Sequence, residues 1–345
     1  MKPRFKELNQ FIQDAQKKGN PQVLQIQVVQ NGKQVLKKHY GKNYRYFDVA
    51  SLTKIMTTTP LLMKLYDTGA FKLDDPISKY LEFLKSTALE KISIKKLLAH
   101  NSGLVWWRPY YKKLLKFSNG LRKSQLKNLI RSEKTRSTRS CVYSDPDYFL
   151  LGWLVEELYG MPLEEASNLY IFEPLGLKNT SFRCLKKSEA APTGRTKLRG
   201  LIQGVVHDDN TWSLGGVSSH AGVFSTLEDV TTYGLSLLDH VNSESSFLFR
   251  PKTARIFTSR AVPRNVGDWG LGFMIPSRPI SSGGGLINEH AFGHTGFTGT
   301  SLWIDVKRQA VVTVLSNRTM PESRDERFLK LRREIHDAVW RVLGE

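Results

Sequence analysis

The sequence predicts an α/β (α+β) fold, in which a mixed, mainly antiparallel sheet is flanked by helices and an all-helical domain is inserted into the chain. Three observations support it: alternating strands open the chain, helical patterns fill its middle, and two strands and a helix close it. A chain of 345 residues also has room for two subdomains. We therefore expect an α/β domain made of residues 1–55 and 225–345, and a mostly helical domain at 56–224.

The chain opens with a predicted helix and a β-hairpin. Residues 4–18 place five apolar side chains at helical spacing: Phe5, Leu8, Phe11, Ile12 and Ala15. Residues 23–30 alternate between apolar and polar, which is typical of a strand, and Asn31-Gly32 is a strong hairpin signal. The return strand is expected over residues 34–40.

The rest of the chain is expected to be helical first and stranded later. Helical patterns dominate from residue 53 to about 175, and Gly, Ser and Thr then become frequent. Apolar residues alternate over 301–316, in two strands around a Lys307-Arg308 turn. Residues 324–343 predict a last helix, whose apolar face would carry Phe328, Leu331, Ile335, Ala338 and Val342.

Composition excludes several classes of protein. Hydrophobic residues make up 40% and charged residues 24%, so the chain is neither disordered nor collagen-like. No apolar run approaches the roughly 18 residues that a membrane span needs. The first 22 residues hold no apolar run of the secretory type, so we expect a cytoplasmic protein unless a leader has been removed. The two cysteines, Cys141 and Cys184, do not make a disulfide framework.

The formal net charge of +19 predicts attraction to anionic partners. Residues 108–139 hold eleven Lys or Arg and a single acid, Glu133. This segment is either a solvated basic helix face or a surface for an anionic partner. No helix-turn-helix, zinc-finger or RNA-binding signature accompanies it, so we do not expect nucleic-acid binding.

The first candidate for chemistry is the run from Ser51 to Lys54. On a helix these two side chains share a face, and a serine needs a neighbour that takes its proton before it becomes a good nucleophile. A partly desolvated lysine is able to do so. Two other Ser-x-x-Lys matches, at 93–96 and 124–127, lie in basic amphipathic stretches, whereas Ser51 precedes an apolar helix.

Two further motifs carry candidate groups. Tyr143-Ser144-Asp145 precedes a helix-like run, and a phenol near an ammonium can ionise and act as a base. The alternative is a turn with a helix-capping aspartate. In residues 294–299, a histidine is followed by Thr, Gly, Phe, Thr and Gly, and the backbone N–H groups of such a strand can stabilise an oxyanion. The alternative is a glycine-rich loop with a satisfied histidine.

Taken in order, these motifs resemble the serine β-lactamase and penicillin-binding-protein superfamily, whose pattern is S-x-x-K, S/Y-x-N and K/H-T/S-G. The closest branch is that of class C β-lactamases, D-carboxypeptidases and related esterases. Four other segments resemble the same branch, at 73–80, 97–104, 171–177 and 220–226. The likeness runs from about residue 23 to 320 and implies a β-lactamase/transpeptidase-like fold, with an active site at the seam of the two domains.

The resemblance also implies roles. Ser51 would be the acylated nucleophile, Lys54 would tune it and shuttle its proton, and Tyr143 would be the general base. The N–H groups of Ser51 and Phe297 would form the oxyanion hole. The residues expected to contact substrate are Asp145, His294, Thr295, Gly296 and Phe297.

The sequence departs from the family pattern at three places. Asp145 stands where Asn is usual; when ionised it cannot donate to a substrate amide, but it can pair with Lys54. His294 replaces the usual Lys, and it would favour an anionic or polar group on the substrate or hold Tyr143 by a hydrogen bond. Pro60 should kink or break the helix that follows Ser51. Residues 204–210, which include His207-Asp208-Asp209, either shape the pocket or form a turn with capping acids.

The leading hypothesis is therefore a carboxypeptidase or amidase acting on D-amino-acid peptides from cell walls. A small-ester carboxylesterase, a β-lactamase and a catalytically silent ligand-binding homologue remain alternatives. The basic segment suggests an anionic substrate, held by Lys112, Lys113 and Lys116. No cofactor is expected, and no metal: His290 and His294 are four residues apart, but their stretch is too rich in glycine for a helix. The oligomeric state is left open.

Overall fold

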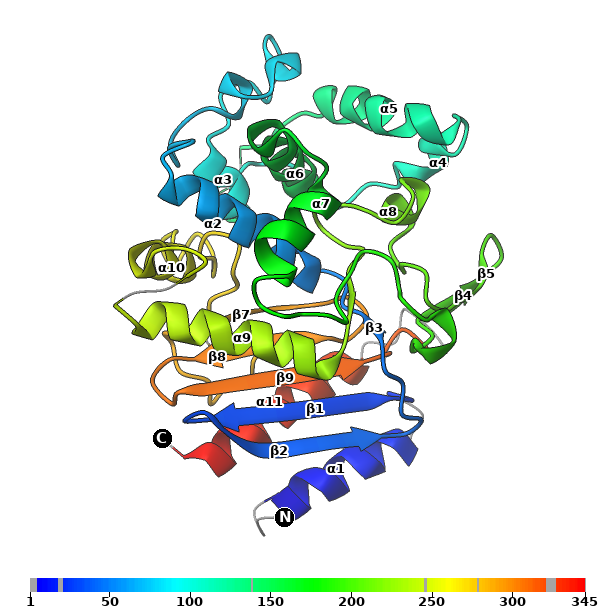
Figure 1. Ribbon diagram of the computed structural model, residues 1–345, viewed down its shortest axis with the longest axis vertical. Helices are drawn as coiled ribbons and strands as arrows, with labels where there is room; N and C mark the ends of the chain where they lie inside the picture. The colour runs from blue at the N-terminus through cyan, green and yellow to red at the C-terminus, as the bar shows by residue number, and fades with distance from the viewer. Residues whose placement is uncertain are drawn as a thin grey trace.

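The structure is a computed structural model that describes residues 5–17, 21–137, 139–244, 247–277, 279–320 and 327–344. Its main feature is a five-stranded antiparallel sheet with strand order β2-β1-β9-β8-β7 (Figure 1). The strands are β1 (Leu24–Gln30), β2 (Lys33–Tyr40), β7 (Phe292–Thr295), β8 (Ser301–Asp305) and β9 (Ala310–Ser316). Both chain ends contribute to it, so the predicted mixed α/β architecture with a mainly antiparallel sheet is confirmed.

The two ends of the chain meet where β1 pairs with β9 at the centre of the sheet. The predicted hairpin precedes this contact: Asn31 and Gly32 both have positive φ, at 50° and 71°, as a tight two-residue turn between β1 and β2 requires. Strands β8 and β9 are buried at every residue, although their sequence alternates. Burial on both sides follows from the helices that cover both faces of the sheet.

Helix α9 (Leu227–Asn242) covers one face, and α1 (Lys6–Lys17) and α11 (Arg327–Leu343) cover the other (Figure 1). The apolar faces predicted for α1 and α11 pack into one hydrophobic cluster with β1, β8 and β9. Residues 4, 18 and 324–326, which the sequence assigned to these two helices, lie outside the described residues. Helix α9 was not predicted, although Thr226 caps it through the Asp229 N–H and acids occupy its first turn.

A second layer of mostly short helices lies beside the sheet and forms the upper half of Figure 1. They are α2 (Thr59–Asp67), α3 (Ile94–Leu98), α4 (Tyr111–Leu114), α5 (Asn119–Arg131), α6 (Asp145–Tyr159), α7 (Leu163–Ser167), α8 (Asp209–Ser213) and α10 (Pro251–Thr258). Between the halves, β3 (Phe47–Asp48) pairs with β6 (Phe224–Ser225), and β4 (Gly194–Thr196) pairs with β5 (Gly200–Ile202) in a hairpin that was not predicted. Helix α10 packs on both α9 and α2, so the helical layer and the helix on the sheet are in contact. We propose that the two domains of the chain divide at 55/56 and 224/225.

The helix after Ser51 changes its register but is not broken at Pro60: helical residues run without a gap from Leu52 to Asp67. Residues Lys54–Thr58 form a π-helical turn, in which the N–H of Thr59 bonds to the carbonyl of Lys54, and α2 begins with Pro60 in its first turn. Continuing the π register would need an N–H from residue 60 to the carbonyl of Ile55, which proline lacks. The hydroxyl of Tyr233 in α9 donates to that carbonyl instead. The helix is thereby tied to α9, which lies on the sheet.

None of the helices within the described ranges is long and apolar enough to cross a membrane.

A glycine in α9 tests how tightly the helix packs on the sheet. A Cβ at Gly234 would lie 2.7 Å from Val311 and 2.8 Å from Leu302, whereas a Cβ at Gly120 near the start of α5 would meet open space. We expect Gly234→Ala to lower the free energy of unfolding by about 1–3 kcal/mol, because the central strands have no room to yield. The matched Gly120→Ala should leave it unchanged or raise it by up to about 1 kcal/mol. Urea unfolding measures both, and equal effects would contradict the packing described.

Candidate active site

Ser51 lies in a turn whose backbone is held by Asp48. The turn follows β3, and Ala50, just before Ser51, has a positive φ of 48°. Asp48 Oδ1 accepts the N–H of Ala50 at 2.8 Å, and its Oδ2 accepts the N–H of His207 at 2.6 Å. A non-glycine residue rarely adopts this conformation unless its surroundings impose it. The Asp48 carboxylate therefore fixes the backbone that presents Ser51.

Lys54 is the centre of the site, and its side chain is fully buried. Its Nζ lies 3.2 Å from Ser51 Oγ, 2.6 Å from the Tyr143 hydroxyl and 2.7 Å from Asp145 Oδ1. It also donates to the carbonyl of His220 at 3.2 Å. A buried ammonium is stable only when paired and hydrogen-bonded, and these four acceptors provide both. The structure thus brings together Ser51, Lys54, Tyr143 and Asp145, as the motifs predicted.

Tyr143 is positioned by the start of α6. Ser144 caps this helix by accepting the N–H of Asp147, and the N–H of Asp145 donates to the carbonyl of Trp106 at 2.9 Å. The Tyr143 hydroxyl lies 2.7 Å from Ser51 Oγ, and its ring stacks on Trp269 with an interplanar angle of 15°. The alternative of a helix-capping aspartate is wrong, because Ser144 is the cap and Asp145 is the first residue of α6.

The phenol of Tyr143 keeps its proton at neutral pH in the resting protein. Burial raises its pKa well above the ordinary value, the charge of Asp145 raises it further, and the hydrogen bond with Ser51 opposes them only in part. Once the phenolate forms, the ammonium of Lys54 at 2.6 Å stabilises it. The arrangement can supply a base to Ser51, but only after Tyr143 has lost its own proton.

A buried network supports Tyr143 from behind. His100, which has a positive φ of 53°, accepts the N–H of Ser144 at its Nδ1, and the same nitrogen lies 3.2 Å from Asp147 Oδ2. Ser102 donates to Asp147 Oδ1 at 2.5 Å. Burial lowers the pKa of His100 and raises that of Asp147, so a neutral pair is favoured. The segment at 97–104 had signalled the family, but its sequence did not reveal this positioning role.

The loop after β7 is hydrogen-bonded to the backbone just before Ser51. Thr298 Oγ1 donates to the carbonyl of Asp48 at 2.8 Å, and Thr300 Oγ1 to that of Val49 at 3.0 Å. A Cβ at Gly296 would lie 2.0 Å from Thr300 Oγ1 and 2.6 Å from the carbonyl of Val49, so only glycine allows this approach. These contacts join the first and last parts of the α/β domain at the site.

Two backbone amides of this junction have no hydrogen-bond acceptor. Within the described ranges, neither the N–H of Ser51 nor that of Phe297 donates to another group. Arg318 Nε donates to the carbonyl of Phe297 at 2.6 Å and so fixes the orientation of that peptide. Both amides are available for a developing oxyanion.

His294 is buried and neutral. Its Nδ1 lies 2.8 Å from the carbonyl of Thr295, and burial lowers its pKa to about 3. The ring centroid is 5.9 Å from that of Tyr143, and no hydrogen bond joins the two side chains among the described contacts. His294 therefore adds no positive charge, and the hydrogen bond to Tyr143 considered above is absent. The side chain of His290 is 83% exposed, and no metal-binding cluster occurs in the described part of the chain.

A cavity of about 480 Å³ is lined in part by Ser51. Of the predicted contact residues, Asp145 and Phe297 line it, whereas His294, Thr295 and Gly296 do not. The sequence interpretation missed the acidic and aromatic character of this wall. The lining residues are Asp48, Ala50, Ser51, Trp106, Trp107, Asp145, His207, Asp208, Asp209, His220, Ala221 and Phe297. They include four aspartates and neither Lys nor Arg, so the expected lysines do not reach the cavity.

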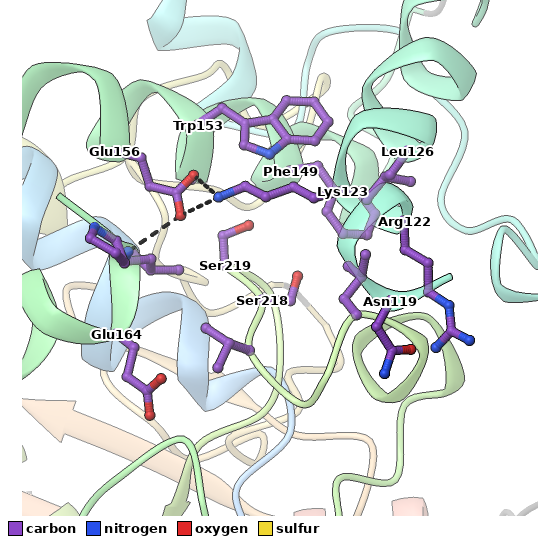
Figure 2. Close-up of a pocket in the computed structure, with 15 residues that line it drawn as sticks. Asn119, Arg122, Lys123, Leu126, Phe149, Trp153, Glu156, Glu164, Ser218 and Ser219 are labelled. Atoms are coloured by element: carbon purple, nitrogen blue, oxygen red, sulfur yellow. Dashed lines mark hydrogen bonds and ion pairs between the residues drawn. The ribbon is translucent and has the colours of Figure 1, made fainter. Parts of the chain in front are cut away.

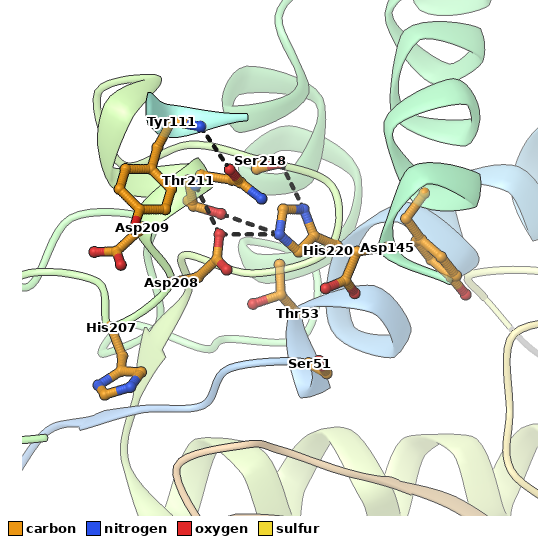
Figure 3. A network of polar contacts seen from close by, with 12 residues as sticks. Ser51, Thr53, Tyr111, Asp145, His207, Asp208, Asp209, Thr211, Ser218 and His220 are labelled. Atoms are coloured by element: carbon orange, nitrogen blue, oxygen red, sulfur yellow. Dashed lines mark hydrogen bonds and ion pairs between the residues drawn. The ribbon is translucent and has the colours of Figure 1, made fainter. Parts of the chain in front are cut away.

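Asp208 combines both alternatives left open for residues 204–210. It caps α8 by accepting the N–H of Thr211 at 2.7 Å, and its Oδ1 also lies 3.1 Å from His220 Nε2 in the cavity wall (Figure 3). Burial alone would raise the pKa of Asp208, but the charge and hydrogen bond of His220 and the bond from Thr211 hold it well below the usual range. Asp208 is therefore ionised at the cavity surface.

Cys141, close to the Tyr143 motif, is an inert thiol. Burial raises its pKa to about 11, and Asp147 and Asp268 add to the shift.

Comparison with known proteins agrees with the motifs. The chain matches the Beta-lactamase family over residues 8–336. A relative from Salmonella gallinarum (strain 287/91 / NCTC 13346), named putative D-alanyl-D-alanine carboxypeptidase, is 30% identical over 358 residues and is matched over 90% of this chain and 82% of its own length.

Solved structures show the same fold. EstCE1, described as a hydrolase with promiscuous acyltransferase activity, gives a TM-score of 0.78 at 19% identity, with 98% of each chain covered. The octameric penicillin-binding protein homologue from Pyrococcus abyssi gives a TM-score of 0.74 at 20% identity, covering 98% of this chain and 77% of its own. At these identities the likeness concerns the fold alone.

The two hydrogen bonds that Asp48 accepts from the N–H groups of Ala50 and His207, here called the Asp48 clamp, predict that the reactivity of Ser51 falls at acid pH. Burial raises the pKa of Asp48 to about 6. Below that pH the carboxyl group is protonated and loses acceptor capacity for its two backbone N–H groups, so the rate at which a fluorophosphonate labels Ser51 should fall. Because the folded pKa lies above the unfolded one, this group stabilises the fold below about pH 4 and loses that contribution as pH rises through 6.

The labelling rate should therefore fall without unfolding, which circular dichroism at each pH verifies. Asp48→Asn does not titrate, and it should remove this limb while lowering the rate at neutral pH. An unchanged acid limb in Asp48→Asn would contradict the clamp.

Proposed function

The chain belongs to the β-lactamase family, and from that membership we propose that it is a carboxypeptidase or amidase of D-amino-acid peptides derived from cell walls, with Ser51 as its nucleophile. One observation carries the catalytic part of the proposal: the hydroxyls of Ser51 and Tyr143 and the ammonium of Lys54 are hydrogen-bonded to one another within 3.2 Å. This is the nucleophile–base arrangement that acyl transfer needs. The family match and the name of the carboxypeptidase relative indicate serine hydrolase activity.

Acylation follows from these contacts. The ionised Tyr143 oxygen takes the proton of Ser51 Oγ while Oγ bonds to the substrate carbonyl carbon. The carbonyl oxygen becomes an oxyanion and accepts the N–H groups of Ser51 and Phe297. When the intermediate collapses, the bond to the leaving amine breaks, and Tyr143 returns its proton to that nitrogen. Lys54 stabilises the phenolate at both ends of this step.

Deacylation repeats the sequence with water. Tyr143 takes a proton from a water molecule that attacks the acyl carbon, and the oxyanion forms again in the same place. The ester bond to Ser51 Oγ then breaks, and the proton returns to Oγ as the acid product leaves. Each cycle consumes one water and restores the Ser51 hydroxyl and the Tyr143 phenolate with which it began.

The substrate class is supported by the name of the Salmonella relative, which is 30% identical across 90% of this chain. A second candidate, a carboxylesterase, is favoured by the cavity itself. A peptide that ends in D-alanine brings a free carboxylate to the leaving group. The cavity lining holds four aspartates without a Lys or Arg, and Lys54 and Arg199, outside the lining, pair with only two of them, Asp145 and Asp209. The neutral His294 offers this carboxylate no charge either. An uncharged ester avoids that repulsion.

Covalent labelling tests the nucleophile. We expect a fluorophosphonate to add one adduct mass to the wild-type protein and none to Ser51→Ala, because the adduct forms on Ser51 Oγ. The matched control is Ser124→Ala, which removes the serine of another Ser-x-x-Lys sequence and should still be labelled. Intact-mass spectrometry reads all three, and a folded wild-type protein that resists labelling would favour the silent ligand-binding homologue.

The values of kcat/KM for a peptide and for an ester then distinguish the carboxypeptidase from the esterase. Release of D-alanine from a peptide ending in D-alanyl-D-alanine should exceed hydrolysis of p-nitrophenyl acetate in kcat/KM, because the proposal assigns the cavity to the peptide. The reverse order would favour the esterase, and rapid turnover of penicillin without a lasting adduct would point to β-lactamase character.

Asp145 should set the pH dependence of the reaction. Its charge raises the pKa of Tyr143, so Asp145→Asn should lower that pKa and move the rising limb of kcat/KM to lower pH. Activity at neutral pH would then rise severalfold. The matched control is Asp209→Asn, which removes another cavity carboxylate, paired with Arg199 at 2.9 Å, and should leave the limb in place. An identical profile for the wild type and Asp145→Asn would contradict a Tyr143 base.

A further inference from the structure

A basic hollow of about 760 Å³ lies next to the catalytic cavity. Its charged lining residues are Arg108, Lys113, Lys134 and Arg136, with Glu133 as its one acid. Glu133 is already engaged, by Arg108 Nε at 2.9 Å and by the hydroxyl of Tyr110 at 2.9 Å. The hollow therefore carries a net charge of +3, from four cations and one anion, beside a cavity lined by aspartates.

Three of these cations are available to a ligand. Lys113, Lys134 and Arg136 are exposed, and none forms an ion pair with the acids in the described ranges. Another hollow, of about 240 Å³ beside α5 and α6, shows the contrast (Figure 2). There Lys123 is paired with Glu156 at 2.6 Å, and Arg122 donates to the carbonyls of Phe117 and Ser213. The two cations of that hollow, Lys123 and Arg122, are therefore already bound to acceptors within the protein.

The basic hollow adjoins the catalytic cavity through one short segment. Trp106 and Trp107 line the cavity, while Val105 and Arg108 on either side of them line the hollow. Two residues of chain span at most about 7 Å, so a peptide of a few residues reaches from one to the other. The Trp106 side chain between them is 60% exposed, which offers a ligand an apolar surface to cross.

The walls of the hollow are fixed. The N–H of Arg136 donates to the carbonyl of Gly103 at 2.8 Å, and a Cβ at Gly103 would lie 2.3 Å from the carbonyl of Arg136. On the opposite side, the carbonyl of Arg108 accepts the side-chain amide of Asn210 at 2.8 Å. A ligand would therefore meet a preformed basic surface rather than a loose loop.

We propose that this hollow is a second subsite of the same substrate and binds carboxylates that lie several residues away from the bond attacked by Ser51. The inference rests on the proposed peptide substrate. The basic hollow then orients the peptide, because it attracts the carboxylates that lie upstream of the bond attacked by Ser51. The sequence had suggested Lys112, Lys113 and Lys116 for an anionic substrate; of these, only Lys113 lines the hollow.

The test uses two peptides that end in D-alanyl-D-alanine and differ only upstream, where one carries free side-chain carboxylates and the other their amides. For the carboxylate peptide we expect Lys113→Glu and Arg136→Glu each to raise KM about five- to tenfold with kcat unchanged, since each reverses an exposed charge. The amide peptide and p-nitrophenyl acetate should be unaffected. The matched control is Lys116→Glu, which reverses an exposed lysine of the same segment outside the hollow.

Equal effects of Lys116→Glu and Lys113→Glu, or equal effects on both peptides, would overturn the subsite. Failure of the proposed function looks different: the wild type would then release D-alanine from neither peptide. In that case, fluorescence anisotropy with Ser51→Ala measures binding of the two labelled peptides at low salt. A preference for the carboxylate peptide that disappears in Ser51→Ala/Lys113→Glu would support the subsite, and the absence of any preference would overturn it.

Discussion

The buried ammonium of Lys54 is the constraint on which the site depends. A charge without solvent must be surrounded by acceptors, and these come from separate parts of the chain: the Ser51 turn, the start of α6 and the carbonyl of His220 before β6. Satisfying Lys54 therefore fixes the helical half against the sheet half. The same contacts place the Ser51 and Tyr143 hydroxyls 2.7 Å apart, so packing and chemistry share one set of hydrogen bonds.

The sheet completes the site through its loops. The hydroxyls of Thr298 and Thr300 hold the loop after β7 on the backbone at 48–49, while the Asp48 carboxylate holds Ala50 in its left-handed conformation. Within the described residues, the N–H groups of Ser51 and Phe297 at this junction have no acceptor in the protein. Charged side chains of opposite sign line two neighbouring spaces: aspartates line the cavity, and lysines and arginines line the adjoining hollow. This polarity bears on substrate choice more than the net charge of +19 does.

Local sequence signals predicted the sheet from both chain ends and the Asn31-Gly32 hairpin, because periodicity and turn residues encode them. The contact of Tyr143 with Ser51 and Lys54 was expected only from the resemblance of three motifs to a known family, since 92 residues separate Tyr143 from Ser51. Helix α9 was missed, since its capping signal lies in a region rich in small polar residues. The neutral state of His294 and the acidic cavity wall depend on burial and on contacts between distant segments, which no local pattern reveals. The basic segment 108–139 is a similar case. Its lysines can be identified in the sequence, but only the fold shows which of them line the hollow.

The most direct test of this account is the rate constant with which a fluorophosphonate phosphonylates Ser51 in Lys54→Met, compared with Lys64→Met. Both substitutions keep a long apolar side chain, but Lys64 in α2 donates to the carbonyl of Leu248, away from Ser51. The account predicts that Lys54→Met, folded by circular dichroism, is labelled about 10²- to 10⁴-fold more slowly than the wild type, while Lys64→Met keeps the wild-type rate. Labelling of folded Lys54→Met at the wild-type rate would contradict it.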